Sequence, residues 1–245
     1  MNQSRRFVDF DIAVGGVLPA APVLLLGVPI EAEGMRAGCS EAPDAIRRAS
    51  AALPAGHVVK GLDMGNLPLD DDWRAPVRDF VSLSIGQGSI PVLLGGGPEV
   101  AGVALEAVED LPVVAATHVL RPGLVERNAV WIGLNGPQDA RLWDKLMEGS
   151  RAFLTARQVE DGATIEYPDQ TFLWIDAAVL DTGHAAGAAD INPGGLAPDA
   201  LMKAIGSLRG RIRGIVITGA TPARDPRGLT EFVLASAIRE FLGND

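Results

Sequence analysis

Short apolar runs alternate along the whole chain with segments in which apolar and polar residues mix. Several runs are apolar at every position rather than at every second one. That pattern is typical of strands buried on both faces of a parallel sheet. The clearest is PVLLLGVPI at 22–30, which prolines bound. The strands predicted in this way are 22–30, 57–62, 90–94, 112–116, 129–134, 153–155, 171–176 and 214–218.

The segments between these runs have helical spacing. In the first of them, Pro43 suits an initial turn, and Ile46, Ala49 and Leu53 recur on one helical face. The predicted helices are 42–53, 73–85, 98–108, 138–147, a short one from about 156, 198–208 and 229–242. Strands and helices that alternate from end to end predict a three-layer α/β/α fold with a mainly parallel central sheet.

No linker-like stretch or shift in composition divides the chain, so residues 1–245 are predicted to form a single domain, with a weakly patterned N-terminal arm over 1–20. The chain has 245 residues, of which 47% are hydrophobic and 21% charged, so it can bury a sizeable core. Its net charge of −10 argues against nucleic acid and against anionic membranes as partners. Neither a signal peptide nor a membrane span is predicted, and the cytoplasm is the expected location.

The stretch 171–196 looks most like a site, because a buried strand there ends at Asp176 and a loop rich in Gly, Ala and Asp follows. In a parallel sheet, sites form at the carboxyl ends of strands. Asp176 and Asp181 are candidates either for helix caps or for metal ligands. His184 lies in the same loop. His118 follows another strand, where a lone histidine is more often structural than catalytic.

Other features give weaker signals. Gly95–Gly97 follows a strand but lacks the pattern of a nucleotide-binding loop, and Pro98 removes a backbone donor, so a tight strand-to-helix turn is predicted. Cys39 is the single cysteine, which excludes an intrachain disulfide and leaves open whether its thiol is reactive.

Five segments, taken in order, resemble the ureohydrolase family, which comprises arginase, agmatinase and formimidoylglutamase. They are LGVP at 26–29, GCSEAPDAIR at 38–47, LDMGN at 62–66, PGGL at 193–196, and ATPARD at 220–225 followed by LT at 229–230. The Ala-Pro form of the second segment is closest to the formimidoylglutamase branch. The resemblance implies an arginase-like fold, a trimer or hexamer, and hydrolysis of guanidino or formimino C–N bonds by two Mn²⁺ ions that two histidines and four aspartates hold.

The metal ligands of that family transfer poorly to this chain. Two positions keep a ligand, His118 and Asp176, whereas the closing acidic residue of the family falls at or near Gly219. Two divalent ions about 3.5–4 Å apart need bridging carboxylates. One carboxylate and one imidazole do not meet that need. The positions at which the expected ligand is replaced are Pro98, Ala116, Leu120 and Ala178.

The leading hypothesis is therefore a ureohydrolase-like protein without the two-manganese site, which acts as an inactive binding, regulatory or structural homologue, assembled with itself or with an active relative. No cofactor is expected. The alternative is a hydrolase of a linear amidine, guanidine or amide C–N bond that uses a reduced or single site for Mn²⁺ or another divalent metal, with His118 and Asp176 as weak ligand candidates. A third possibility is an unrelated activity in the same pocket. The vestigial pocket is expected to comprise His118, Asp176, Asp181, Glu99 and His184.

The ligand itself has no clear signal. The loops that select substrate in the family correspond to 31–40, 121–127 and 182–192, which are rich in Gly and Ala. Three arginines, Arg36, Arg121 and Arg127, are either a clamp for a carboxylate or ordinary surface residues.

Overall fold

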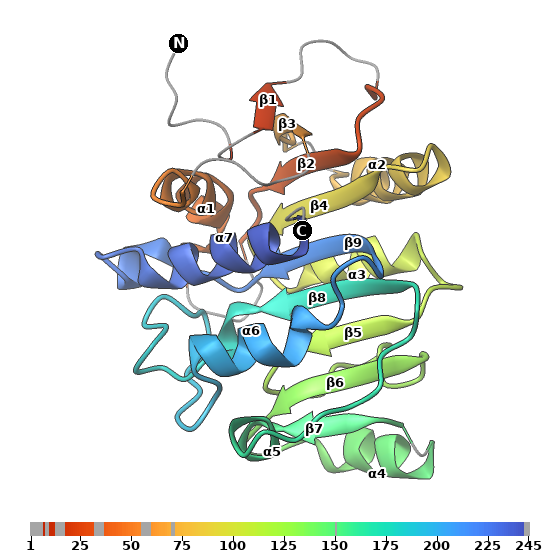
Figure 1. Cartoon of the computed structure of the whole chain (residues 1–245), viewed down its shortest axis with the longest axis vertical. Helices are drawn as coiled ribbons and strands as arrows, with labels where there is room; N and C mark the ends of the chain where they lie inside the picture. Colours follow the sequence, from red (N-terminus) through yellow and green to blue (C-terminus); the bar gives the residue numbers. More distant parts are fainter. Residues whose placement is uncertain are drawn as a thin grey trace.

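A parallel sheet of nine strands runs through the molecule (Figure 1). The computed structural model describes residues 7, 10–12, 18–31, 37–54, 60–69, 72–149 and 151–242. All strand pairs in the sheet are parallel, and the order is β1-β3-β2-β4-β9-β8-β5-β6-β7. The strands are β1 Phe10–Ile12, β2 Val23–Val28, β3 Gly61–Asn66, β4 Ile90–Gly95, β5 Val113–Ala116, β6 Ala129–Leu134, β7 Phe153–Thr155, β8 Thr171–Asp176 and β9 Ile212–Thr218.

Helices cover both faces of this sheet, which confirms the predicted three-layer α/β/α architecture. One apolar core contains side chains of α1, α5, α6 and α7, and the other contains side chains of α2, α3 and α4. The helices are α1 Ala42–Ser50, α2 Arg74–Gly86, α3 Glu99–Glu106, α4 Ala140–Glu148, α5 Ala156–Glu160, α6 Pro198–Gly206 and α7 Leu229–Leu242.

The all-apolar strands are buried on both faces, as their sequences predict. Every residue of β8 is buried, and its side chains alternate between the two cores. Phe172 and Trp174 lie in the core with α3, whereas Leu173 and Ile175 lie in the opposite core. This alternation fixes which face of the sheet each strand residue serves.

The structure departs from the sequence prediction at the N-terminal side of the sheet. The second predicted strand, 57–62, is shifted, because β3 begins at Gly61 and continues to Asn66, while 55–59 lie outside the described residues. The predicted N-terminal arm contributes β1, which pairs with β3 at the edge of the sheet. Three residues are too few for a periodic pattern to predict a strand.

The connection between β5 and β6 contains no helix, unlike the connections around it. The helical layer on that face therefore passes directly from α3 to α4, and the segment 117–128 covers the sheet between them. Among the described helices, none is long and apolar enough to cross a membrane.

Candidate functional site

The candidate site lies at the carboxyl ends of four adjacent strands, β4, β9, β8 and β5. Asp176 ends β8 and is in register with Thr218 at the end of β9. The turn after β4 leads to Glu99, and the turn after β5 leads to His118. Parallel pairing brings these four strand ends to one edge of the sheet, so the structure places three of the predicted site residues along it.

Asp176 is completely buried, and each of its carboxyl oxygens has a polar neighbour. Its Oδ1 accepts a hydrogen bond from the backbone N–H of Ala178 at 3.0 Å, so it caps the short 3-10 helix Ala177–Val179. Its Oδ2 lies 3.4 Å from Nη2 of Arg121. Gly219 packs so closely that a Cβ there would lie 2.4 Å from Oδ1 of Asp176. The cap that the sequence suggested is present, and an arginine supplies the counter-charge.

His118 is buried and points to a partner that the sequence analysis did not identify. Its Nε2 lies 3.3 Å from Oδ2 of Asp190, an exposed residue of the long loop after β8. Its Nδ1 is buried without a hydrogen-bond partner among the described residues. No local motif in the sequence signals this pairing.

The other two loop candidates have different positions. Asp181 organises the loop, because its Oδ1 accepts from the N–H of Gly183 at 2.7 Å and its Oδ2 accepts from the N–H of Gly194 at 2.6 Å. His184 is exposed. Asn192 closes the loop on the strand end by donating to the carbonyl of Ala178 at 2.8 Å.

The donor set at this edge does not fit a pair of divalent metal ions. Within the described part of the chain, no group of three or more His, Cys, Asp and Glu residues is arranged to hold a metal. Two Mn²⁺ ions need several hard oxygen and imidazole ligands, with carboxylates between them. The sequence resemblance assigns most of these ligands to Pro98, which is half-buried, and to the buried Ala116, Leu120 and Ala178.

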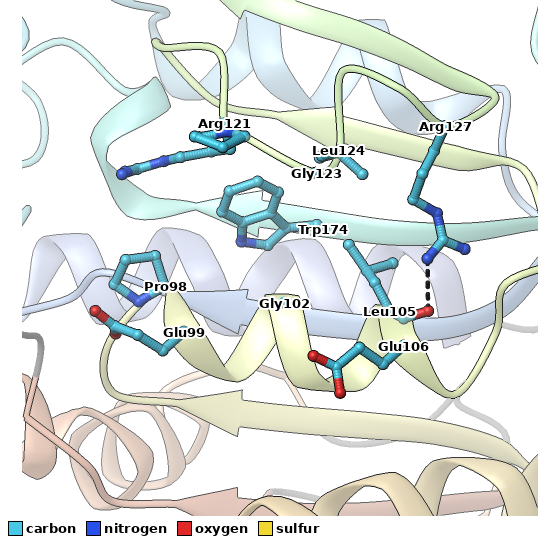
Figure 2. A pocket seen from close by; sticks show the side chains of 11 residues that line it. Pro98, Glu99, Gly102, Leu105, Glu106, Arg121, Gly123, Leu124, Arg127 and Trp174 are labelled. Carbon is cyan, nitrogen blue, oxygen red and sulfur yellow. Dashed lines mark hydrogen bonds between the residues drawn. The ribbon is translucent and has the colours of Figure 1, made fainter.

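An open cleft of about 400 Å³ begins at this edge and continues along α3 (Figure 2). Figure 2 shows the ring of Trp174 as its floor, with α3 on one side and the segment 121–127 on the other. Glu99 and Arg121 lie at the same end of the cleft, and Arg121 also contacts Asp176. Oε2 of Glu99 and Nε of Arg121 are both buried without a hydrogen-bond partner among the described residues.

The charged side chains at the far end of the cleft are already engaged. Arg127 donates to the carbonyls of Leu105 at 2.7 Å and Val108 at 2.6 Å, at the C-terminus of α3. Glu106 forms an ion pair with Arg78 at 3.0 Å. Of the three arginines considered as a carboxylate clamp, Arg127 is thus a helix cap, Arg121 faces the cleft, and Arg36 lies outside the described residues.

Two other predicted features are structural. Burial raises the pKa of the Cys39 thiol, which lies 3.4 Å from the hydroxyl of Thr221, so this cysteine is neither accessible nor activated. At the glycine turn, a Cβ on Gly96 would lie 1.9 Å from the carbonyl oxygen of Ile30. The turn connects β4 tightly to α3, as predicted, and it also brings two backbone segments into close contact.

The remaining motifs hold the fold together. Arg47 and Asp63, each 1% exposed, form a bidentate ion pair at 2.8 and 2.9 Å. Near the C-terminus, Asp225 accepts hydrogen bonds from the N–H and hydroxyl of Thr230 at 2.7 and 2.8 Å. The hydroxyl oxygen of Thr230 also accepts from the N–H of Gly187, which ties the long loop after β8 to α7.

Comparison with known proteins identifies the family of this chain. The sequence model of the arginase family matches residues 21–121 and 113–243. The chain belongs to the arginase family. A formimidoylglutamase from Halobacterium salinarum is 26% identical, and the match covers 95% of this chain and 94% of that protein. The resemblance seen in the sequence is thereby confirmed.

Solved structures show the same fold. Formiminoglutamase from Trypanosoma cruzi, solved with Mn²⁺, is 17% identical with a TM-score of 0.80, over 91% of this chain and 92% of that one. Arginase from Bacillus subtilis is 17% identical with a TM-score of 0.78, over 91% and 99%. The agmatine ureohydrolase of Thermoplasma volcanium is 19% identical with a TM-score of 0.74, over 91% and 89%. These similarities show the fold of the chain, and its chemistry must be inferred from its own side chains.

Proposed function

We propose that this chain is a metal-independent, non-hydrolytic member of the arginase family that serves as a binding or regulatory protein. The observation that carries the proposal is the contact of Asp176 with Arg121. The resemblance assigns Asp176 to a metal ligand, yet here its oxygens are directed to a guanidinium and to the N–H of Ala178.

The charge balance at Asp176 supports this reading. A buried carboxylate without a compensating charge is costly, and a guanidinium is permanently positive. The guanidinium of Arg121 offsets the charge of Asp176, the carboxylate that the resemblance assigns to a metal. The apolar side chains of Ala116, Leu120 and Ala178 also avoid the buried unpaired charges that aspartates would bring in the absence of metal.

A second candidate is a hydrolase of a linear amidine, guanidine or amide C–N bond with one divalent ion. The formimidoylglutamase relative and the pairing of His118 with Asp190 favour it. Asp190 is exposed, and Asp176 is held by Arg121, so this site would first require Arg121 to move away. The metal-independent reading needs no such rearrangement.

Metal analysis decides between the two. Purified protein incubated with excess Mn²⁺ and then desalted is expected to retain far less than one ion per chain by atomic emission. It is also expected to release neither urea nor formamide from arginine, agmatine or formiminoglutamate. Stoichiometric manganese together with product release would refute the proposal and establish the second candidate.

Arg121→Met provides a sharper version of the same experiment. This change removes the guanidinium and leaves Asp176 free to take a metal. Weak Mn²⁺ binding that appears in this variant and is absent from the parent would show that Arg121 takes the place of the metal charge.

We further propose a cytoplasmic homo-oligomer, and light scattering at micromolar concentration tests the assembly, since a monomer would contradict it.

A further inference from the structure

We infer that this chain associates with a second copy of itself through two different surfaces, a basic patch on α1 and α7 of one copy and an acidic hollow between α5 and α6 of the other. The inference rests on the proposed homo-oligomer and adds which surfaces form it. The basic patch comprises Arg48, Ala49, Ala52, Arg227, Leu229 and Phe232. The acidic hollow comprises Glu160, Ala163, Thr164, Asp199, Ala200 and Lys203.

The two surfaces lie at opposite ends of one helical layer. Side chains of α1, α5, α6 and α7 share a core on the same face of the sheet. Within this layer α7 packs against α1 and α6, and α6 packs against α5. Figure 1 shows the same order, with α1 toward one end of the sheet and α5 at the other. One molecule can therefore present both surfaces without either covering the other.

The basic patch has an exposed apolar centre. It is a groove of about 490 Å³ between α1 and the start of α7. Leu229 and Phe232, in the first turn of α7, are 49% and 37% exposed. The exposed Ala52 and the half-buried Ala49 line the same groove from α1. Single exposed apolar side chains are common, but a cluster of them on two neighbouring helices is typical of a surface that binds another protein.

The exposed charges of the basic patch are both positive. Arg48 and Arg227 are exposed, and neither forms an ion pair within the described part of the chain. The acids that also line the groove, Asp225 and Glu231, are buried, and burial raises the pKa of Glu231. Arginine and aromatic side chains are enriched at the centres of protein interfaces, so the patch has the composition of a binding surface.

Charge indicates a second copy as the partner. The chain has a net charge of −10, so its surface outside the basic patch is acidic overall. A copy that approached with its own basic patch would place arginines against arginines, and like charges that face each other across an interface are unfavourable. The patch therefore meets a different, acidic surface of the second copy.

The acidic hollow supplies such a surface. It has a volume of about 590 Å³ and lies between the segment 159–167 and α6. Glu160 and Asp199 outnumber Lys203 among its exposed charges, and the exposed Glu166 lies in the same segment. The small side chain of Ala163 leaves room for an apolar group. Interfaces commonly seat an aromatic side chain of one partner in a pocket of the other.

Two further hollows of the described chain are balanced in charge. The lining of the cleft over Trp174 has two acids and two arginines. The lining of a hollow beside α4 has Asp144 and Arg157. Neither has an excess of negative charge to attract the basic patch, so electrostatic complementarity favours the acidic hollow and fixes how the two copies are oriented.

Charge-reversal variants of each surface test the inference. Arg48→Glu/Arg227→Glu alters the basic patch, and Ala163→Arg/Asp199→Arg alters the acidic hollow. All four side chains are exposed, so both double variants are expected to fold, which circular dichroism checks. Arg141→Glu is the control, because Arg141 is exposed on α4 in the opposite helical layer.

Sedimentation velocity at micromolar concentration measures the assembly. The parent and the control are expected to be oligomers, and each double variant is expected to raise the dissociation constant at least about tenfold. An equimolar mixture of the two double variants is expected to restore association as dimers, because one intact patch can then meet one intact hollow. Such restoration would also show that both variants are folded.

Three results would overturn the inference. Oligomers that neither double variant weakens would do so and leave the proposed homo-oligomer intact. A mixture as dissociated as either variant alone would show that the two surfaces do not pair. A monomeric parent would refute both the inference and the proposed homo-oligomer. Manganese retention is measured separately, so the metal-independent function and this inference can fail independently.

Discussion

Two buried carboxylates in this molecule, Asp63 and Asp176, have very different surroundings. Asp63 receives two hydrogen bonds from Arg47 at 2.8 and 2.9 Å and one each from the N–H groups of Phe7 and Gly65, both at 2.9 Å. Asp176 has a single backbone donor and an arginine at 3.4 Å. Both side chains are at most 1% exposed, so burial does not explain the difference.

The difference separates a carboxylate whose hydrogen bonds are complete from one whose neighbours include unsatisfied polar atoms. At Asp63 the carboxyl oxygens are saturated, and Arg47 also donates to Asn66 and to the carbonyl of Gly65. Near Asp176, two polar atoms form no hydrogen bond with the described residues, namely Nε of Arg121 and Oε2 of Glu99. A saturated buried network rigidifies a core, whereas unsatisfied buried polar atoms carry a cost in free energy.

Breaking the saturated cluster should have the largest effect. Arg47→Met leaves Asp63 buried without its counter-charge, and we expect a loss of about 3–5 kcal/mol in the free energy of unfolding. Urea denaturation followed by circular dichroism measures this loss. The exposed Arg141→Met in α4 is the control and should change stability by less than about 0.5 kcal/mol. A small effect of Arg47→Met would contradict the structural role of this pair.

Breaking the unsaturated cluster should cost less. In Arg121→Met, Asp176 loses a contact at 3.4 Å with an arginine that is 29% exposed but keeps the N–H of Ala178. We expect a loss of about 1–2 kcal/mol in urea denaturation. If the loss equalled that of Arg47→Met, the two clusters would be equivalent, and the contrast between them would fail.

Glu231 extends the comparison to a buried acid without a cation bonded to it. It is 1% exposed, and neither carboxyl oxygen is hydrogen-bonded to another described residue. Burial raises its pKa above the ordinary 4.5. As pH rises from that value toward the raised one, the unfolded chain releases its proton first, so the folded state loses stability across this window.

Glu231→Gln removes this titration and should stabilise the protein by about 1 kcal/mol at pH 7. The gain should disappear below about pH 4, where both states carry the proton. Thermal unfolding measured from pH 4 to pH 8 tests this trend. The exposed Glu148→Gln serves as the control and should show no such pH-dependent gain. A gain that does not vary with pH would indicate a packing effect and not the release of a buried charge.

The sequence predicted the layers of this fold well because the relevant signal is local. Continuous apolar runs such as β2 and β8 reflect burial on both faces, and the structure confirms strands and helices close to the predicted bounds. The edge strand β1 escaped prediction because it is short, and its position depends on pairing with β3. A strand of that kind is defined by its neighbour and not by its own residues.

The site was only partly predictable, because its contacts join distant segments. Spacing after strands correctly placed Asp176 and His118 at the sheet edge but could not show that Arg121 or Asp190 would face them. The cleft over Trp174 depends on the missing helix between β5 and β6, a property of the packed layer. The resemblance identified the fold, whereas the contacts between side chains of distant segments are visible only in the structure.

The strand order also has a consequence for how this protein is made. β4 and β5 are neighbours in the sequence, yet β9 and β8 separate them in the sheet. During synthesis the chain must therefore extend through Thr218 before the two halves of the sheet can join. Until then β4 and β8, which has already paired with β5, present bare, apolar inner edges, the kind of surface to which other chains add strands. Nascent copies released before β9 should thus be especially prone to aggregation and to need chaperones.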